Sequence, residues 1–503
     1  MRVPTLRRLA AFVVIGGIVA GCGFLTEDSR EQVNVRVNDD DDDNGPPTTA
    51  GRDISDVEDR LEVGDPDEED NRVILAALQD VEAYWENEFP DVYGGDFEPV
   101  SAFFAYGPDT ESPPCGPTDP PYEEIAGNAF YCSGTDIIAW DTTELIPDLQ
   151  AEFGDFTLGI VVAHEYGHAI QDRFGFDERL TLTFEQQADC FAGAWAEWVY
   201  DENAENFTLR ASLTDLDSAL AGFLQLRDAI NTSLLDPNAH GTAFDRVSAF
   251  QDGFISGAES CAEYRDGNVP AVPLEFLDQG FLGRQPDAPF EEVEPFALQD
   301  LNNFWTTAFD SLGAEWGEPD AVPLDPEDSD LPDCGRDELD EDDVSGQALY
   351  CAADDYVAWD EAELMPELYE EIGDMAVALT IGTEFSEAAL EKLGDESEEP
   401  DRGLRADCLT GAWIASSVLQ DRGDFDDTNP LGNVFVLSPG DLDEAVVAFL
   451  TDPGGEEAGT AFVRIASLRE GFFTSLEAES STEGVEFCVN EFRSEDADAE
   501  GGE

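Results

Sequence analysis

Residues 157–170 read TLGIVVAHEYGHAI, and this stretch decides the fold and the chemistry that the chain can support. The run is mostly apolar, which predicts a largely buried helix. On a helix, His164 and His168 lie one turn apart on the same face, so both imidazoles can reach one ion. Glu165 stands next to His164 and is a candidate general base toward a water molecule. The pattern therefore predicts a metal-dependent hydrolytic site on this helix.

A second stretch, residues 185–195, reads EQQADCFAGAW and offers further ligands. Glu185 and Asp189 are four residues apart and share a helix face. A catalytic zinc takes three protein ligands and keeps a fourth position open, and two histidines with one glutamate are a standard set. Glu185 is thus the candidate third ligand, and Asp189 is a candidate acceptor that would fix the tautomer of a ligating imidazole. Manganese or iron would also suit this set, but two histidines and a carboxylate on a hydrolase motif favour Zn²⁺.

With these two stretches the sequence resembles the family of putative neutral zinc metallopeptidases, whose signature joins HEYGH-x-x-Q to a later E-x-Q-A-D-C-x-A-G-x-W. The likeness continues in Phe130-Tyr131-Cys132, which follows Cys115-Gly116, and in His240-Gly241-Thr242, and it covers about residues 75–265. The resemblance implies a zincin-like fold in which two histidines and Glu185 hold zinc and Glu165 acts as the base. A peptide or protein substrate is implied in the same way.

The charge of the chain bounds its partners. Asp and Glu number 116 against 23 Lys and Arg, which gives a formal net charge of −93. Such a chain repels nucleic acid and anionic lipid, so neither is an expected ligand. With 42% hydrophobic residues, including 33 Phe, it is nevertheless able to build packed cores. The charge favours a solvated acidic surface of the kind found in halophilic proteins.

The N-terminus has the pattern of an export signal. Three arginines in the first eight residues precede the apolar residues 9–19, and small residues follow. This order predicts a secretory signal peptide over residues 1–21. Cys22 follows Val-Ala-Gly, which resembles a bacterial lipobox, so we expect a lipidated Cys22 that anchors an extracytoplasmic protein to the cell membrane. A twin-arginine signal is one alternative. An uncleaved membrane anchor is another, although the apolar run is short for a span.

The chain also repeats itself. Residues 126–145 (AGNAFYCSGTDIIAWDTTEL) align with residues 345–364 (SGQALYCAADDYVAWDEAEL), and shorter stretches farther along align as well. A repeat of more than 200 residues indicates a tandem duplication of a whole domain. We expect a signal peptide at 1–21, an acidic disordered tether at 22–70, a metallopeptidase copy at 71–265, a linker at 266–298, a degenerate metal-free copy at 299–490 and an acidic tail at 491–503.

Eight cysteines remain after Cys22, four in each copy. An even number of cysteines in an exported protein indicates disulfides. A cysteine-based zinc site is the rival interpretation, but it requires C-x-x-C-like clusters, which this sequence lacks. Sequence alone cannot fix the connectivity. The preferred pairing is Cys115–Cys132, Cys190–Cys261, Cys334–Cys351 and Cys408–Cys488.

The second copy serves as an internal control for the candidate site. HEYGH at 164–168 becomes TEFSE at 383–387, and Glu185 becomes Gly403, so the second copy has lost the metal ligands together. His240 becomes Ala458, which suggests that His240 belongs to the site, as a donor to the oxyanion of a tetrahedral intermediate. A buried structural histidine is the alternative.

Two polar residues of the first copy are kept in the second. Asp189 is matched by Asp407, so a structural role for Asp189 stays open beside its role next to the metal. Arg246 is matched by Arg464, which argues for a structural role. Residues that persist where no metal can bind must contribute to the fold.

The pattern of elements predicts an α+β fold for each copy, mostly helical with a small sheet. Residues 100–106 and 136–140 are expected strands, and residues 184–200 and 216–229 are expected helices. The leading hypothesis is an exported, lipid-anchored zinc metallopeptidase. The alternative is a catalytically inactive surface binding or assembly lipoprotein that keeps the peptidase fold. Bound zinc in the first copy would separate the two hypotheses.

Overall fold

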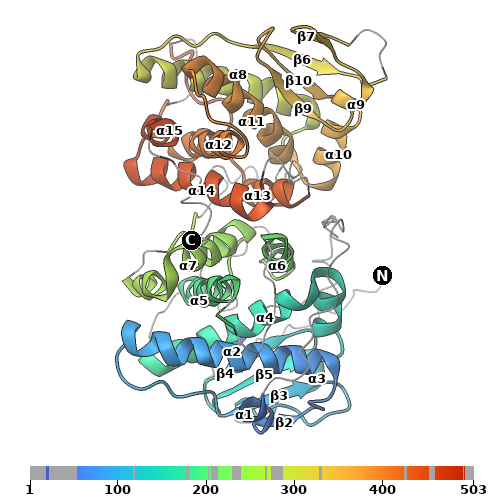
Figure 1. Ribbon diagram of the computed structural model, residues 1–503, viewed down its shortest axis with the longest axis vertical. Coiled ribbons are helices and arrows are strands. Elements are labelled where there is room, and N and C mark those ends of the chain that lie inside the picture. The colour runs from blue at the N-terminus through green and yellow to red at the C-terminus, as the bar shows by residue number, and fades with distance from the viewer. Residues whose placement is uncertain are drawn as a thin grey trace, which may run out of the picture.

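The computed structural model describes residues 19–21, 54–116, 119–176, 181–201, 203–204, 213–228, 240–266, 269–272, 287–327, 331–423, 428–451, 459–490 and 492. The chain forms two lobes, one above the other in Figure 1. We call residues 19–21 and 54–272 the first half and residues 287–492 the second half. Within the described ranges, no helix combines the length and apolar character needed to cross a bilayer.

A mixed sheet forms one side of the first half. Its strands are β1 (Val19–Gly21), β2 (Leu61–Val63), β3 (Ala102–Tyr106), β4 (Ala129–Cys132) and β5 (Ile137–Asp141), in the order β1-β4-β5-β3-β2. Strands β2, β3 and β5 run parallel, whereas β4 is antiparallel to β5 and β1 is antiparallel to β4. Every residue of β4 and β5 is buried, which explains why these strands are continuous rather than alternating apolar runs.

The helices of the first half are α1 (Ser55–Glu58), α2 (Glu69–Val92), α3 (Tyr122–Ile125), α4 (Leu145–Phe174), α5 (Thr181–Tyr200), α6 (Leu213–Gln225) and α7 (Ala243–Glu263), followed by the 3₁₀ turn η1 (Tyr264–Asp266). Helix α4 is kinked at Gly154, whose positive φ of 79° suits glycine. The H-E-x-x-H motif lies in the straight, buried part of α4 that follows this kink. The predicted buried helix is therefore present, and it extends upstream of the motif.

Helices α5 and α7 touch each other at their backbones. A Cβ atom added to Gly193 would lie 1.9 Å from the carbonyl oxygen of Phe250, and one added to Gly253 would lie 1.8 Å from that of Cys190. No larger residue fits at either position. The Cys190–Cys261 disulfide joins the same two helices. This crossing fixes α5, which carries Glu185 and Asp189, against α7.

The second half contains α8 (Phe290–Leu312), β6 (Asp320–Leu324), β7 (Asp333–Cys334), β8 (Asp337–Glu338), α9 (Glu341–Val344), β9 (Ala348–Cys351), β10 (Tyr356–Asp360), α10 (Leu364–Glu371), α11 (Asp374–Leu393), α12 (Asp401–Leu419), α13 (Asp441–Thr451), α14 (Ala461–Ala478) and α15 (Ser481–Asn490). Its main sheet has the order β6-β10-β9, with β6 parallel and β9 antiparallel to β10. This arrangement matches β3-β5-β4 of the first half.

Further features recur in both halves. Gly411 and Gly471 bring α12 and α14 together as closely as Gly193 and Gly253 bring α5 and α7 together. The four disulfides are present in the preferred pairing, and Cys115–Cys132 and Cys334–Cys351 both span a separation of 17 residues. These features therefore recur in the two halves in the same order along the chain. The α+β fold class is confirmed, with mostly helical halves and small sheets of zincin-like character.

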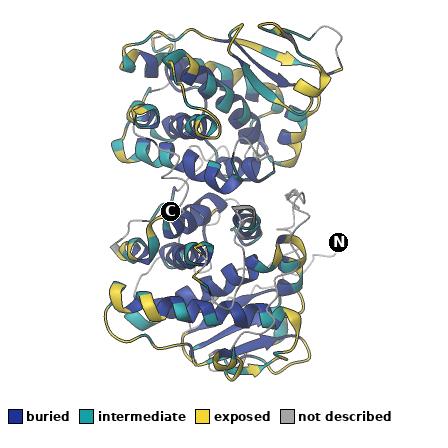
Figure 2. Ribbon diagram, in the orientation of Figure 1, coloured by how far each residue is buried: buried dark blue, intermediate teal, exposed yellow. Residues whose placement is uncertain are grey.

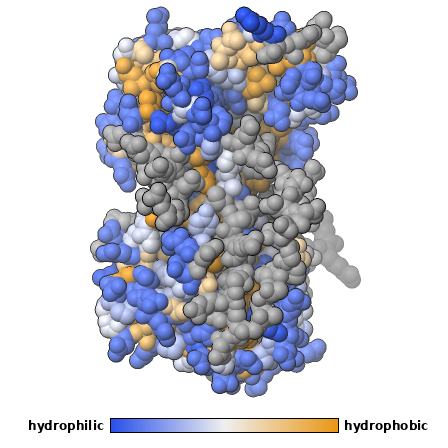
Figure 3. Space-filling model, in the orientation of Figure 1, coloured by the Kyte–Doolittle hydropathy of each residue, from blue (hydrophilic) through white to orange (hydrophobic). Residues whose placement is uncertain are grey.

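Buried residues concentrate in the helices and sheet strands inside each lobe and in the helices at which the lobes meet (Figure 2). Tryptophans form much of the packing, and Trp85, Trp140 and Trp195 are among the largest fully buried side chains of the first half. On the face shown in Figure 3, hydrophilic residues predominate among the described residues. The core is mainly apolar and aromatic, although it also contains buried carboxylates such as Glu165, Glu185 and Asp189.

Candidate metal centre

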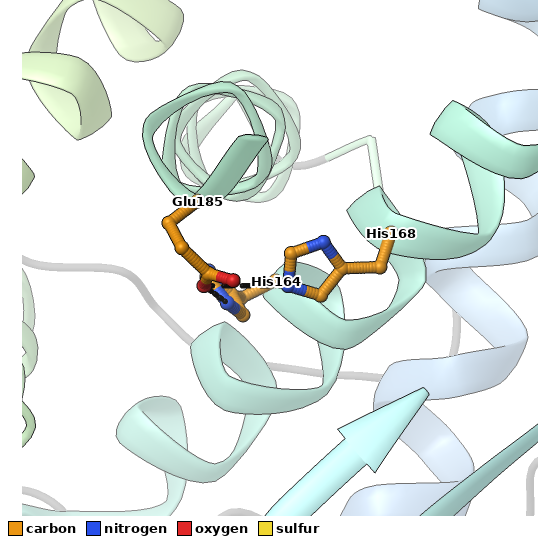
Figure 4. Close-up of side chains that lie close together, drawn as sticks. All are labelled: His164, His168 and Glu185. Carbon is orange, nitrogen blue, oxygen red and sulfur yellow. Dashed lines mark ion pairs between the residues drawn. The ribbon is translucent and has the colours of Figure 1, made fainter. Parts of the chain in front are cut away.

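Three buried side chains converge between helices α4 and α5 (Figure 4). His164 and His168 come from α4, and Glu185 comes from the first turns of α5. Oε2 of Glu185 lies 3.3 Å from Nε2 of His164 and 3.5 Å from Nε2 of His168. Their potential ligand atoms all lie within 4.8 Å of one another. The structure thus brings together the three residues that the sequence nominates as metal ligands.

The chemistry of this group fits a zinc ion. Nε2 of His168 and Oε2 of Glu185 are buried, and neither atom has a hydrogen-bond partner among the described residues. Burying such atoms without partners is costly, and coordination to a cation would satisfy them. Burial alone would raise the pKa of Glu185, yet the neighbouring histidines hold that pKa well below its usual range. A charged carboxylate and two imidazole nitrogens form one of the standard ligand sets of catalytic zinc.

His164 is oriented by a chain of polar contacts. Its Nδ1 lies 2.6 Å from Oδ1 of Asp189. Arg246, on α7, donates to both carboxylate oxygens of Asp189, from Nε at 2.9 Å and from an NH2 nitrogen at 2.8 Å. Contact with a carboxylate at Nδ1 favours a proton there and leaves Nε2 as the ligand atom. Asp189 therefore occupies the position beside a ligating imidazole that the sequence proposes for it.

His168 is oriented by a residue to which the sequence analysis gave no role. Its Nδ1 lies 2.8 Å from Oε1 of Gln171, whose amide donates to the carbonyl of Phe184 at 2.7 Å. The ring of Phe184 stacks on His168 with a centroid distance of 4.7 Å. The internal comparison contains the missing signal, because Leu390 stands where Gln171 would be and cannot hold an imidazole.

Glu165 lies on the same helix and is fully buried. Its Oε2 accepts a hydrogen bond of 2.8 Å from the backbone nitrogen of Tyr131, on strand β4. The candidate base is thus held between the metal-ligating helix and the strand next to it. Glu165 thus adjoins His164 in the sequence of α4 and contacts β4, the strand next to the edge strand β1.

His240 also reaches the cluster. Its Nε2 lies 4.0 Å from Oε2 of Glu185, and its Nδ1 lies 3.6 Å from Oδ1 of Asp228. Asp228 further accepts 2.9 Å hydrogen bonds from the backbone nitrogens of His240 and Gly241. Thr242 then caps α7 through a capping box with Asp245. His240 and Gly241 are therefore held between Asp228 and the start of α7.

The equivalent place in the second half has different chemistry. Thr383 bonds to the carbonyl of its own helix at Leu379, at 3.2 Å, and Glu387 forms an ion pair of 2.6 Å with Arg402. A cavity of about 590 Å³ lies there, lined in part by Thr383, Glu384 and Glu387. All three histidines of the chain belong to the first half, so no histidine ligand is available.

A further cluster of side chains among the described residues, outside the candidate metal centre, is close enough to be considered as a metal site. Asp287, Asp374 and Glu444 form a second group of close acidic side chains, but it contains only carboxylates and by itself defines no site. Cys22, the candidate lipidation residue, lies outside the described residues, as does Ala458, the counterpart of His240.

Comparison with known proteins finds one family that is similar to the region containing this site. The model of the family described as "Putative neutral zinc metallopeptidase" matches residues 46–264, a range that contains every candidate ligand. The match covers less than half of the chain, and over this range it confirms the resemblance noted in the sequence. The match begins upstream of the expected residue 75 and ends before the second half.

The individual relatives are themselves uncharacterised. The chain is 32% identical over 146 residues to "Uncharacterized protein YpfJ" of Escherichia coli K12, which is 25% of this chain and 50% of that protein. It is 30% identical over 167 residues to "Uncharacterized protein Rv2575" of Mycobacterium tuberculosis H37Rv, 28% of this chain and 55% of that protein. The chain thus spans about half the length of the curated relatives that it matches. No solved structure gives a significant match.

Proposed function

We propose that this protein is an exported, lipid-anchored zinc metallopeptidase whose active site lies in the first half. The observation that carries the proposal is the convergence of His164, His168 and Glu185 in a buried group with unpartnered ligand atoms on His168 and Glu185 among the described residues. These residues would hold Zn²⁺, which when bound supplies Lewis-acid polarisation of a scissile carbonyl and lowers the pKa of a water molecule.

The residues around this group have defined tasks. Glu165 takes a proton from the attacking water as its oxygen bonds to the carbonyl carbon, and it returns that proton to the amide nitrogen as the C–N bond breaks. Asp189 and Gln171 keep Nδ1 of the two ligating histidines engaged, so that each Nε2 faces the ion. His240 donates a hydrogen bond to the developing oxyanion, a role that its approach to Glu185 supports.

Strand β4, beside Glu165, would suit an extended peptide once its outer side is exposed. Strand β1 lies antiparallel along β4, with Ala20 opposite Tyr131, whose backbone nitrogen bonds to Glu165. In the proposed mature protein, cleavage before Cys22 removes β1 and leaves β4 as the edge. The backbone groups of β4 would then be able to pair with a substrate strand next to the base.

Zinc stoichiometry is the experiment that tests the proposal. The mature chain, residues 22–503 without the lipid, is purified in the absence of chelators, and its metal content is measured beside His164→Ala and Glu185→Gln. We expect one zinc per chain, lost in both variants, together with hydrolysis of a fluorescent casein substrate. A zinc-free protein would overturn the proposal. Two zinc ions per chain would show that the second half also binds metal.

Binding without hydrolysis is a second candidate function, favoured by the cavity of about 590 Å³ in the second half. Apolar residues such as Leu364 and Phe449 line this cavity together with Glu384 and Arg464. Such a cavity can hold a side chain of a peptide, but it has no histidine ligands with which to support hydrolysis of a peptide bond. Zinc in the first half separates this candidate, as the function of the whole protein, from the peptidase.

A further inference from the structure

The two halves meet through α6 and α7 of the first and α13 and α14 of the second (Figure 1). The polar contacts across this interface are reciprocal. Asp217, on α6, accepts hydrogen bonds from the backbone nitrogens of Ala461 and Phe462 at the start of α14, at 3.2 and 2.6 Å. Asp443, on α13, accepts one of 3.0 Å from the backbone nitrogen of Phe244 at the start of α7. Each half therefore caps a helix of the other.

The two capping residues are equivalent in sequence. Asp217 ends the triplet Asp-Leu-Asp at 215–217 and Asp443 ends the same triplet at 441–443, while the capped helices begin with AFDR at 243–246 and AFVR at 461–464. Asp217 thus contacts the start of α14, and its equivalent Asp443 contacts the start of the equivalent helix α7. This exchange gives the interface the pattern of an approximate two-fold axis.

Aromatic contacts follow the same reciprocity. Phe244 packs edge-on against Phe472 at a centroid distance of 5.4 Å, and Phe462 packs edge-on against Phe254 at 4.9 Å. Phe254 and Phe472 occupy equivalent positions in α7 and α14. All four rings are buried, so this is a packed core shared by the halves rather than a loose contact between lobes.

The two capped helices differ in what they carry. Helix α7 follows His240 and bears Arg246, which holds Asp189 and through it His164. Helix α14 bears Arg464, which holds Asp407 in the same bidentate way, but no metal ligand lies beyond it. The cap on α7 is therefore connected to the candidate metal centre through Arg246 and Asp189. The cap on α14 leads through Arg464 and Asp407 to a place without metal ligands.

Asp443 also contacts the second support of the metal centre. Its Oδ2 lies 3.9 Å from Nε of Arg227, and the next residue, Asp228, binds the backbone of His240 and Gly241. The buried carboxylate of Asp443 thus abuts both segments that orient His240 and Arg246. In an isolated first half, the backbone amides at the start of α7 and the guanidinium of Arg227 would face solvent at this point.

We propose that Asp443 is a positioning residue for the metal centre, and that the second half acts as a built-in partner of the first. By fixing the first turn of α7, Asp443 fixes Arg246, Asp189 and His164 in the orientation that binds the ion. This inference rests on the proposed zinc site in the first half. It assigns the metal-free second half a task that needs no chemistry of its own.

The two-fold pattern supplies the matched control for a test. Asp443→Asn and Asp217→Asn are made separately in the full mature chain, and the affinity for Zn²⁺ is measured by competition with a chromophoric chelator, beside the midpoint of thermal unfolding. Both variants lose one reciprocal cap, so both are expected to lower the midpoint by similar amounts. Only Asp443→Asn is expected to weaken zinc binding, by about tenfold or more, as losses of metal-supporting contacts do.

The outcomes are distinct. Equal zinc affinities in the two variants, with zinc bound to the unaltered chain, would overturn this proposal and leave the proposed function intact. An unaltered chain without zinc would overturn both. If either asparagine variant fails to fold, Asp443→Glu and Asp217→Glu keep the charge and displace the carboxylate, and the same difference in zinc affinity is expected between them.

Discussion

The two halves share an arrangement of helices and strands but differ in the side chains at the equivalent site. In the first, His168 faces Glu185 and stacks on Phe184; in the second, Glu387 and Arg402 take the places of His168 and Phe184 and form an ion pair. The Asp–Arg pair behind the site is nevertheless the same, with Asp189–Arg246 in one half and Asp407–Arg464 in the other. The Asp–Arg pair therefore belongs to the fold that the two halves share. The candidate metal ligands are present only in the first half.

The sharpest way to break the comparison is to remove the base. Glu165→Gln keeps the size of the side chain but cannot take a proton, so hydrolysis of casein is expected to fall by about 100- to 10,000-fold. Zinc content should stay at one per chain. Glu384→Gln, the same exchange in the second half, is the control and should leave activity unchanged. Activity that survives in Glu165→Gln would assign the base to another residue.

A smaller effect is expected from converting the support of His168 to its counterpart. Gln171→Leu introduces the residue that the second half has at this position, and Nδ1 of His168 loses its acceptor. Zinc affinity should fall by about 10- to 100-fold, as measured by chelator competition. Gln171→Glu keeps an acceptor oxygen and is expected to retain more of the affinity. If Leu and Glu behave alike at position 171, the contact with His168 has no role in binding.

His240→Ala tests the residue that is lost together with the ligands. We expect kcat for peptide hydrolysis to fall while zinc stoichiometry remains one, because the ring is proposed to act on the oxyanion rather than on the ion. The loss should be smaller than that of Glu165→Gln. Full activity would assign His240 to the fold, and a loss of zinc would make it a ligand.

The smallest effect concerns stability and lies in the second half. Burial, followed by nearby Glu387, raises the pKa of Glu384 to about 8 from an ordinary 4.5. The folded state then binds more protons than the unfolded state between these values, so this carboxylate lowers stability as pH rises from about 4.5 to 8. Glu384→Gln should therefore raise the midpoint of thermal unfolding by several degrees at pH 8 and change it little at pH 4.5. An equal change at both pH values would contradict this assignment.

The elements that local pattern defines were predictable from the sequence. The expected helix at 184–200 is α5 (Thr181–Tyr200), and the expected strand at 136–140 is β5 (Ile137–Asp141). The expected helix at 216–229 instead ends at Gln225, because Asp228 turns to bind the backbone of His240 and Gly241. That end is set by a distant segment, which no local periodicity can reveal.

The candidate site divides in the same way. His164, His168 and Glu185 follow from spacing on two helices, because ligands four residues apart must share a face. Gln171 is the last residue of the HEYGH-x-x-Q signature, but the spacing does not reveal that it contacts His168. Asp443 lies on the other half of the chain, and its contact with α7 exists only once both halves have folded. The sequence could therefore nominate the ligands and Asp189, but not the contacts of Gln171 and Asp443.

One contact between equivalent residues of the two halves shows what a single chain permits. Arg469 donates to Oε1 of Gln251 at 2.9 Å, and the two residues occupy equivalent positions in the two halves. In a dimer of identical subunits both would be glutamine or both arginine, and two buried guanidinium groups would repel each other. Because both halves belong to one chain, the two equivalent positions can carry different residues. The contact between Arg469 and Gln251 is instead unequal and charge-assisted, so the two halves are not interchangeable at this point.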